Sequence, residues 1–284
     1  MNAQATLVTA DRLQALLARG AVLVVDCRCD LADAGGGARA HRAGHVPGAV
    51  HADLEHDLSD LSKAGLGRHP LPDAHAFSQV LRRWGWTRDI DVVAYDAAGG
   101  ALAAARLWWM LRLAGHARVA VLDGGFQAWR DGGRPLEAGD VRREVSQVDV
   151  SFDAADVVGY DELQQRLRDR SALLVDARAA PRFRGEVEPL DPVAGHVPGA
   201  VNRPFQDNLA ADGTFRSRDA LRESFSALLA GRDPREVVHM CGSGVTACHN
   251  LLAMEHAGLR GSRVFAPSWS GWVDDRSRPV AIGN

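Results

Sequence analysis

The sequence is poor in cysteine, has little net charge and contains no long apolar run. Its 284 residues include four cysteines and carry a formal net charge of −3, with both signs spread along the chain. Four unevenly placed cysteines are too few for the disulfide framework of a small secreted protein. The weak charge gives no electrostatic footprint for nucleic acid or for a membrane surface. We therefore expect no nucleic-acid partner and no membrane partner.

The N-terminus lacks the features of an export signal. Residues 1–14 contain neither a basic region nor an apolar segment, so the sequence predicts no signal peptide. No apolar run reaches the length that spans a bilayer. Neither pair of cysteines has the Cys-x-x-Cys spacing of a redox or zinc motif; the pairs are Cys27 with Cys29 and Cys241 with Cys248. These absences predict a cytoplasmic, reduced setting and no bound metal.

The most informative stretch lies at residues 237–250. Val237–Met240 is a short apolar run that predicts a buried strand, and Cys241 follows directly at its end. A glycine-containing loop comes next, and from Ala247 the apolar residues have helical spacing. Open α/β sheets bind ligands at the carboxyl ends of their strands. We therefore predict that the Cys241 thiol lies where such a sheet binds its ligand.

The loop after Cys241 has the composition of an anion-binding site. Gly242 and Gly244 allow the backbone to curl so that successive N–H groups point inward at the start of a helix. Such dipoles favour the thiolate form of a cysteine, which is the nucleophilic form. The alternative is a buried structural cysteine, the commoner role of a cysteine outside disulfides.

The sequence also contains a long repeat. Residues 43–50 and 194–201 are identical, both reading AGHVPGAV, and each copy follows an apolar strand that ends in Asp-x-Arg. An identity of this length in matched context predicts a duplicated domain. Alternating strands and helices predict an α/β fold with two tandem domains, each a mostly parallel sheet covered by helices on both faces. The predicted boundaries are 1–138 for a non-catalytic domain, 139–156 for a linker and 157–284 for the catalytic domain.

The two copies differ at the position of the thiol. Aligned strand–loop–helix units place Asp96 of the first copy opposite Cys241 of the second, so the first copy lacks the nucleophile. The Asp-x-Arg pairs and the histidines of both AGHVPGAV strings occur in both copies, which favours a structural role for them.

Cys248 lies one to two turns into the helix after Cys241. It is expected to be a core thiol, because helix geometry works against a disulfide between Cys241 and Cys248.

Taken together, these features resemble the tandem-domain rhodaneses. The loop Cys-Gly-Ser-Gly-Val-Thr at residues 241–246 is similar to that of the 3-mercaptopyruvate sulfurtransferases, whereas thiosulfate sulfurtransferases usually carry basic residues at the positions of Gly242 and Ser243. The resemblance implies a ping-pong sulfur transfer without a cofactor. The Cys241 thiolate takes sulfur from a small-molecule donor, and a thiol, thioredoxin or cyanide then removes it from the persulfide.

The resemblance also implies roles for individual residues. Cys241 matches the nucleophile, and the loop that holds the sulfur consists of Gly242, Ser243, Gly244, Val245 and Thr246. Arg182 matches an arginine that grips the donor's carboxylate or sulfonate, a task suited to a planar guanidinium. Ser243 and His69, a histidine from the first half of the chain, match a pair that assists proton transfer to pyruvate.

The chain departs from the family pattern in two places. Mercaptopyruvate enzymes often carry a second arginine just after a Glu-Pro pair, and here Glu188-Pro189 is followed by Leu190. Carboxylate binding is therefore expected to rest on Arg182 together with Arg184 or another base. The C-terminal signature usually contains Gly and Glu where this chain has Pro267 and Gly271, which changes a local turn and one hydrogen bond.

Three other functions share some of these sequence features. A thiosulfate:cyanide sulfurtransferase would use the same ping-pong chemistry. A phosphatase of the same fold needs an arginine six residues after its cysteine, and this chain has Ala247 there. A non-enzymatic sulfur-relay or binding module would tolerate loss of the thiol, whereas the second copy keeps the whole loop. The preferred prediction is a sulfurtransferase that moves sulfane sulfur from 3-mercaptopyruvate to a thiol or cyanide through a Cys241 persulfide.

Overall fold

The computed structural model describes residues 5–30 and 32–284, which form two compact units. Of the described residues, unit 1 comprises those up to Asp60 together with 71–153 and 211–215. Unit 2 comprises 61–70, 154–210 and 216–284. Unit 2 therefore includes ten residues from the first half of the sequence, and these residues carry part of the functional site.

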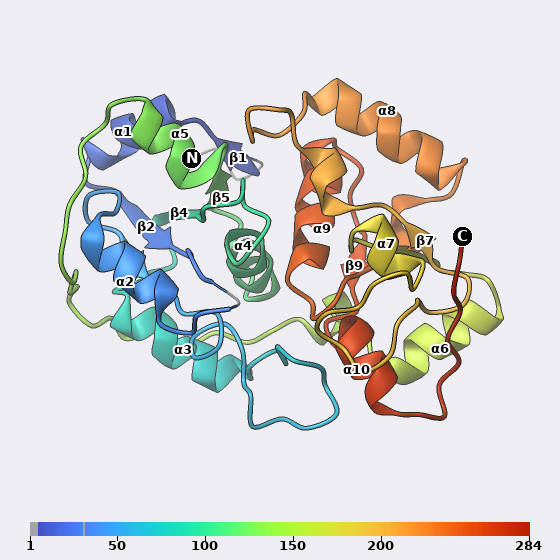
Figure 1. Ribbon diagram of the computed structural model, residues 1–284. Helices are drawn as coiled ribbons and strands as arrows, with labels where there is room; N and C mark the ends of the chain where they lie inside the picture. Colours follow the sequence, from blue (N-terminus) through green and yellow to red (C-terminus); the bar gives the residue numbers. More distant parts are fainter. Residues whose placement is uncertain (1–4, 31) are drawn as a thin grey trace. The chain divides into compact units, whose positions relative to one another are not determined.

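Unit 1 is a parallel α/β unit (Figure 1). Its sheet has five strands in the order β1-β5-β4-β2-β3. The strands are β1 (Leu7–Val8), β2 (Val22–Asp26), β3 (Val50–His51), β4 (Asp91–Tyr95) and β5 (Val119–Leu122). The helices are α1 (Ala10–Leu17), α2 (Gly36–Ala43), α3 (Ala74–Arg83), α4 (Ala104–Leu113) and α5 (Gly125–Asp131).

Helices cover both faces of the unit 1 sheet. Every residue of β2 and of β4 is buried, as expected for a parallel sheet with two covered faces. Leu13 of α1 and Trp129 of α5 pack in one apolar cluster with Val24 of β2. Helix α1 begins after Thr9, whose side chain accepts a hydrogen bond from the N–H of Arg12 at 3.3 Å, as is usual for a threonine at this position.

Unit 2 repeats this architecture with four parallel strands in the order β7-β6-β8-β9. The strands are β6 (Leu173–Asp176), β7 (Val201–Asn202), β8 (Val237–Met240) and β9 (Arg263–Val264). The helices are α6 (Tyr160–Arg168), α7 (Ala180–Phe183), α8 (Arg218–Leu229), α9 (Thr246–His256) and α10 (Ser268–Asp274), with the short 3-10 helices η1 (Ala154–Asp156), η2 (Phe205–Asn208) and η3 (Pro234–Glu236). A single parallel bridge between Val157 and Val264 stands where β1 pairs with β5 in unit 1.

The core of unit 2 lies on both faces of its sheet. Leu163 of α6 and Trp272 of α10 join the buried cluster of β8 residue Val238 on one face. Helix α9 packs against β8 and β9 and against α8. The predicted fold class, two tandem α/β domains with parallel sheets covered by helices, is confirmed. Among the described residues, no helix is both long and apolar enough to cross a membrane.

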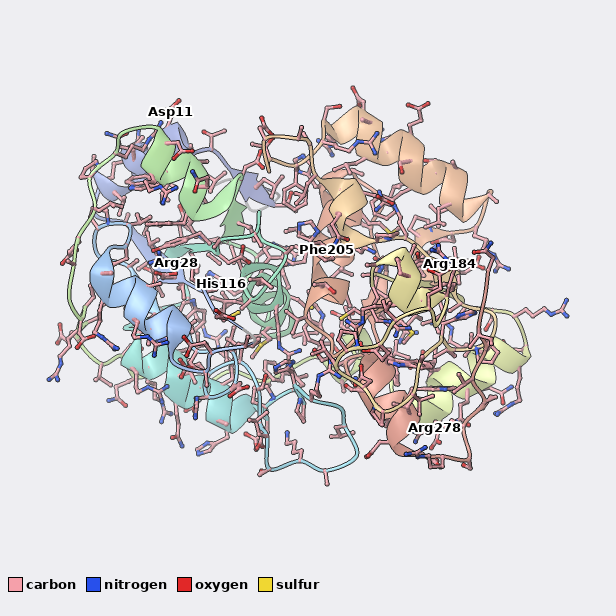
Figure 2. The ribbon with its side chains drawn as sticks, viewed as in Figure 1. Asp11, Arg28, His116, Arg184, Phe205 and Arg278 are labelled. Carbon is pink, nitrogen blue, oxygen red and sulfur yellow. The ribbon has the colours of Figure 1, made fainter. Side chains whose placement is uncertain are left out.

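The Asp-x-Arg pairs form the same buried contact in both units. Arg28, labelled in Figure 2, donates from Nη2 to Asp26 at 2.6 Å. Arg178 donates from Nη2 to Asp176 at 2.7 Å. Both guanidiniums also contact an aromatic face, that of Phe126 in unit 1 at 3.9 Å from the ring centre. Buried charges need such paired, hydrogen-bonded surroundings, so these residues support the strand ends in both copies.

Each AGHVPGAV string pairs through its backbone with a later segment of the same unit. The backbone of His45 forms an antiparallel bridge with Glu137, and that of His196 forms one with Ala281. The Nδ1 atoms of both rings hydrogen-bond to backbone oxygens, for His45 at 2.7 Å and for His196 at 2.8 Å. These contacts agree with the structural role expected for the repeated histidines.

Asp96 fills the strand-end loop of unit 1. It follows β4 directly, is fully buried, and its carboxylate accepts hydrogen bonds from four backbone N–H groups. The distances are 2.8 Å to Ala98, 2.8 Å to Gly100, 3.0 Å to Leu102 and 3.2 Å to Ala104. The loop after this strand is therefore a cradle of amides around a carboxyl group, and burial raises the pKa of that group despite the four hydrogen bonds.

Replacing Asp96 by alanine is expected to destabilise unit 1 by about 3 kcal/mol or more. The substitution leaves buried N–H donors without an acceptor, and each such donor costs about 1–3 kcal/mol. Urea unfolding followed by tryptophan fluorescence measures the change, because unit 1 holds Trp84, Trp86, Trp108, Trp109 and Trp129. The exposed Asp140→Ala is the matched control; equal midpoints for the two variants would contradict the prediction.

Candidate active site

Cys241 lies at the carboxyl end of β8, a central strand of the unit 2 sheet. Its N–H donates to Oγ of Ser268 at 3.1 Å, and its carbonyl accepts from the N–H of Trp269 at 2.9 Å. The residue is 2% exposed. The start of α10 therefore fixes the backbone of the cysteine on both sides and largely shields its sulfur from bulk water.

The loop after Cys241 directs its backbone at the sulfur. The N–H of Gly244 donates to Sγ of Cys241 at 3.2 Å. Gly244 has φ of +77°, and a Cβ there would overlap the carbonyl oxygen of Ala266, so only glycine fits. Helix α9 begins at Thr246, and Val245 before it offers no polar side chain to the first amides of the helix. The Gly244 N–H thus lies within hydrogen-bond distance of the sulfur, in the loop that leads into α9.

Ser243 and His69 lie in contact beside this loop. Oγ of Ser243 and Nδ1 of His69 are 2.8 Å apart, and both residues are buried. His69 belongs to segment 61–70, which is part of unit 2. The structure thus brings together two predicted site residues that are separated by 174 positions in the sequence.

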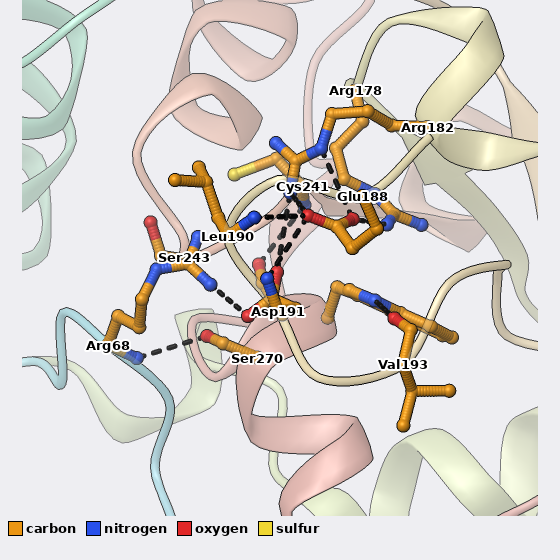
Figure 3. A network of polar contacts seen from close by, with 12 residues as sticks. Arg68, Arg178, Arg182, Glu188, Leu190, Asp191, Val193, Cys241, Ser243 and Ser270 are labelled. Carbon is orange, nitrogen blue, oxygen red and sulfur yellow. Dashed lines mark hydrogen bonds and ion pairs between the residues drawn. The ribbon is translucent and has the colours of Figure 1, made fainter. Parts of the chain in front are cut away.

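Arg182 of α7 is held beside the loop by two acidic side chains (Figure 3). It donates from Nη2 to Glu188 at 2.6 Å and from Nε to the same carboxylate at 3.2 Å. Its Nη2 also lies 3.3 Å from Asp191. A Cβ placed on Gly242 would lie 3.5 Å from Nη1 of Arg182, so this atom faces the residue next to the nucleophile.

The two acids differ in their protonation behaviour. Burial disfavours the charged form of Glu188, but the hydrogen bonds from Arg182 and from two backbone amides outweigh it and lower the pKa of Glu188. Burial raises the pKa of Asp191 above its ordinary value, despite the charge of Arg68 nearby. Arg178 lies 3.4 Å from Glu188, which joins this network to the buried Asp176–Arg178 pair.

The other predicted residues lie in less direct positions. The Sγ of Cys248 is buried and donates to the carbonyl of Gly244 at 3.4 Å, so this thiol supports the loop. Arg184 pairs with the exposed Glu186, and Leu190 is 53% exposed. Neither Arg184 nor Leu190 contributes a cation to the contacts around Gly242.

Two residues in these contacts were missed by sequence reasoning. Ser268 has φ of +54°, an uncommon value for a residue with a side chain, and its hydroxyl supports the Cys241 N–H. Arg68 forms an ion pair with Asp191. The only sequence signal for Arg68 is its place next to His69.

Within the described residues, no group of three or more His, Cys, Asp or Glu side chains could hold a metal, and all four cysteines are thiols.

A thiol at a strand end, with a loop amide donating to its sulfur in the second of two α/β copies, is the arrangement of a sulfur-transfer domain. A family model described as "Rhodanese-like domain" matches residues 9–131 and 160–275. The chain therefore belongs to the rhodanese family, and its activity is that of a sulfurtransferase of the 3-mercaptopyruvate or thiosulfate type.

Named relatives fall into both donor types. The chain is 48% identical over 282 residues to a probable 3-mercaptopyruvate sulfurtransferase of Pseudomonas aeruginosa, covering 99% of each chain. It is 41% identical to the putative thiosulfate sulfurtransferase SseB of Mycobacterium tuberculosis, covering 98% of this chain and 97% of the relative. A solved 3-mercaptopyruvate sulfurtransferase from Leishmania major matches with a TM-score of 0.84 at 31% identity, over 94% of this chain and 74% of that one.

Replacing Glu188 by glutamine is expected to destabilise unit 2 by about 2–3 kcal/mol at neutral pH, because the side chain is 4% exposed and balances buried guanidiniums. The folded pKa of Glu188 is lowered, so its contribution is present above its ordinary value of 4.5 and is lost as pH falls through the folded value. The difference between wild type and variant should therefore shrink at acid pH.

Urea unfolding at a series of pH values, followed by hydrogen exchange of the backbone amides of β6 and β8, measures this effect within unit 2. Glu186→Gln is the matched control, since Glu186 forms an exposed pair with Arg184 and should leave the midpoint unchanged. A difference between wild type and Glu188→Gln that stays constant from neutral to acid pH would argue against an ionised Glu188 in the folded protein.

Proposed function

We propose that the protein transfers sulfur from 3-mercaptopyruvate to a thiol or cyanide acceptor through a persulfide on Cys241. In the first step the thiolate attacks the sulfur of the donor and the carbon–sulfur bond breaks. The electron pair of that bond stays on carbon, and a proton must reach that carbon to give pyruvate. In the second step the acceptor attacks the outer sulfur, and Cys241 leaves as the thiolate.

The observation that carries this proposal is the Ser243–His69 contact. A donor with a carbon–sulfur bond needs a proton at the leaving carbon, and a hydroxyl hydrogen-bonded to an imidazole can supply one. The two groups are 2.8 Å apart and Ser243 lies two residues from Cys241. Thiosulfate leaves as sulfite, a stable anion that needs no such proton. The site is thus better suited to mercaptopyruvate.

The loop amides stabilise the persulfide that forms in the first step. A persulfide is an anion at neutral pH, and the Gly244 N–H already points at Sγ of Cys241. The equivalent loop of unit 1 holds the carboxyl group of Asp96 with four amides. We assign the same function to Gly242, Val245 and Thr246 in unit 2, and we assign Arg182 to the donor's carboxylate. No metal or cofactor takes part in this scheme.

Thiosulfate is the second candidate donor. The relative named SseB is described as a thiosulfate sulfurtransferase, and guanidinium groups bind sulfonates as well as carboxylates. The proposed boundaries remain 157–284 for the catalytic domain, 1–138 for the non-catalytic one and 139–156 for the linker, except that segment 61–70 of the first range packs in unit 2 and brings His69 to the site. Because all four cysteines are thiols, we also propose a reducing cytoplasmic setting, where thioredoxin and small thiols can act as acceptors.

The donor assignment is tested by a paired assay of wild type and Cys241→Ser, with either donor and with cyanide as acceptor. We expect thiocyanate to form with the higher kcat/KM from mercaptopyruvate, and the substitution to reduce both activities by about a thousandfold or more. Cys29→Ser, which changes a partly exposed thiol of unit 1, is the control. Higher kcat/KM with thiosulfate would favour the second candidate, and no turnover with either donor would favour a relay module.

The proton-transfer role is tested with Ser243→Ala and His69→Gln. Each variant should lower kcat with mercaptopyruvate by about a hundredfold, the usual scale of general acid catalysis. Turnover of thiosulfate should change much less, because its leaving group needs no proton. Equal losses with both donors, or none with mercaptopyruvate, would contradict the role; thermal unfolding of each variant checks that the fold is retained.

A further inference from the structure

The helix that carries Arg182 is too short to hold its own shape. Helix α7 is a single turn of four residues. The last carbonyl groups of a helix have no partner within it, and a helix of one turn gains little from its own hydrogen bonds. The carbonyl oxygens of Phe183 and Arg184, at the end of this turn, therefore need donors from other parts of the chain.

Both donors come from segments that follow α7 in the sequence. Nδ1 of His196 lies 2.8 Å from the carbonyl oxygen of Phe183, and it carries the proton because a carbonyl oxygen only accepts. The imidazole also stacks on the ring of Phe183, with 3.8 Å between the ring centres. The N–H of Gly283 donates to the carbonyl oxygen of Arg184, a residue labelled in Figure 2, at 2.9 Å. The end of α7 is thus closed from outside the helix.

The second donor belongs to a strap, defined as residues 279–283, that follows α10 toward the end marked C in Figure 1. The carbonyl oxygen of Pro279 accepts a hydrogen bond from Nε1 of Trp272 in α10 at 2.9 Å. Ala281 and His196 exchange two backbone hydrogen bonds, both of 2.9 Å. The strap therefore joins α10, whose first turn supports the nucleophile, to α7.

The backbone beneath the strap is shaped to receive it. Gly195 has φ of +115°, and a Cβ there would overlap the carbonyl oxygen of Ala281. A Cβ on Gly185, directly after α7, would lie 3.0 Å from Cγ2 of Ile282. Ile282 is nevertheless 75% exposed, so the strap lies on the surface and packs only through its inner side.

Unit 1 contains the same strap beside α2. Residues 135–139 accept, through their first carbonyl group, a hydrogen bond from the indole N–H of α5 at 2.8 Å. Glu137 and His45 exchange backbone hydrogen bonds of 2.8 and 2.9 Å. The N–H of Gly139 donates to the carbonyl oxygen of Arg42 at 2.9 Å. These three contacts match, one for one, those of the strap in unit 2.

The two copies differ in what the strapped turn carries. Arg42 and Arg184 occupy matching places, so Ala40 of unit 1 corresponds to Arg182 of unit 2. The histidine follows its carbonyl partner by 4 residues in unit 1 and by 13 residues in unit 2. The longer connection of unit 2 includes residues 188–191, whose two acids bind the guanidinium of Arg182. Unit 2 has thus kept the strap and added a cation to the turn beneath it.

We propose that the strap and His196 position Arg182 relative to Cys241, and thereby set the affinity of the site for its anionic donor. This inference rests on the proposed function, in which Arg182 binds the donor. The strap acts through α7, so that His196 and Ala281 are positioning residues and do not touch the donor. Without the strap, the turn that carries Arg182 must be ordered at each binding event, which lowers the affinity.

The first test is the steady-state kinetics of Ala281→Pro, which removes one of the two N–H groups that pair the strap with His196. In a ping-pong reaction, kcat/KM for the donor reports the first half-reaction and kcat/KM for cyanide reports the second. We expect kcat/KM for mercaptopyruvate to fall about two- to tenfold, as for the ordering of one long side chain, and kcat/KM for cyanide to stay within about twofold. The same fall with thiosulfate, if that donor is preferred, supports the strap while it counts against mercaptopyruvate.

Unit 1 provides the matched control. Glu137→Pro breaks the same backbone contact in the copy whose strapped turn carries no donor-binding arginine, so both values of kcat/KM should stay within about twofold. Ile282→Gly is a second variant with little risk to the fold, because it removes an exposed side chain; it should give a smaller fall in the donor half-reaction alone. Equal losses in both half-reactions, the same loss in Glu137→Pro, or no loss in Ala281→Pro and Ile282→Gly would overturn the proposal.

Binding without turnover distinguishes failure of this inference from failure of the proposed function. Pyruvate is titrated calorimetrically into Cys241→Ser and Cys241→Ser/Ala281→Pro, and hydrogen exchange is followed at the amides of residues 184–186, whose hydrogen bonds close α7. Weaker binding with faster exchange in the double variant supports the strap even if wild type fails to turn over mercaptopyruvate. Unchanged exchange, equal binding by the two proteins, or no binding by Cys241→Ser overturns the role of the strap whatever the wild-type activity.

Discussion

The structure depends on one backbone arrangement, a loop at the carboxyl end of a central parallel strand whose N–H groups donate to the side chain directly after that strand. Both units build it at the same place in the topology, after β4 in unit 1 and after β8 in unit 2. In unit 1 the loop closes around the carboxyl group of Asp96, and in unit 2 the Gly244 N–H points at Cys241. The same arrangement thus holds a carboxyl group in one copy and a thiol in the other.

Around this loop, unit 2 adds charged side chains whose positions are set by one another. Glu188 and Asp191 hold the guanidiniums of Arg182 and Arg68 on the side of the loop that carries Gly242. Such a network is costly to break, since removal of one member leaves others buried without a partner. The network places two guanidiniums beside Gly242, although residue 190 itself is apolar.

Much of this could be predicted from the sequence. The apolar runs at Asp91–Tyr95 and Val237–Met240 are strands with those bounds, and the eight-residue repeat correctly indicated two α/β domains. The Cys241 loop follows the predicted strand and precedes the predicted helix. The strands, the loop and the helix are local features set by neighbouring residues, and the repeat is a direct identity between two stretches of sequence.

What could not be predicted depends on contacts between distant segments. Nothing in the stretch around Arg68 shows that residues 61–70 pack on α10, because that contact is made by glycine backbones and by Ser270, some two hundred positions later. The support that Ser268 gives to the Cys241 N–H is likewise invisible in the sequence. Charge pairing across a fold can be derived only once the fold places the partners.

The central claim is that Cys241 carries the sulfur between donor and acceptor. Intact-protein mass spectrometry after incubation with mercaptopyruvate, in the absence of acceptor, tests it most directly. The account predicts a gain of one sulfur atom per chain, located on the peptide that contains Cys241 and removed by cyanide. A gain located on Cys27, Cys29 or Cys248, or no gain from a donor that the protein nevertheless turns over, would contradict it.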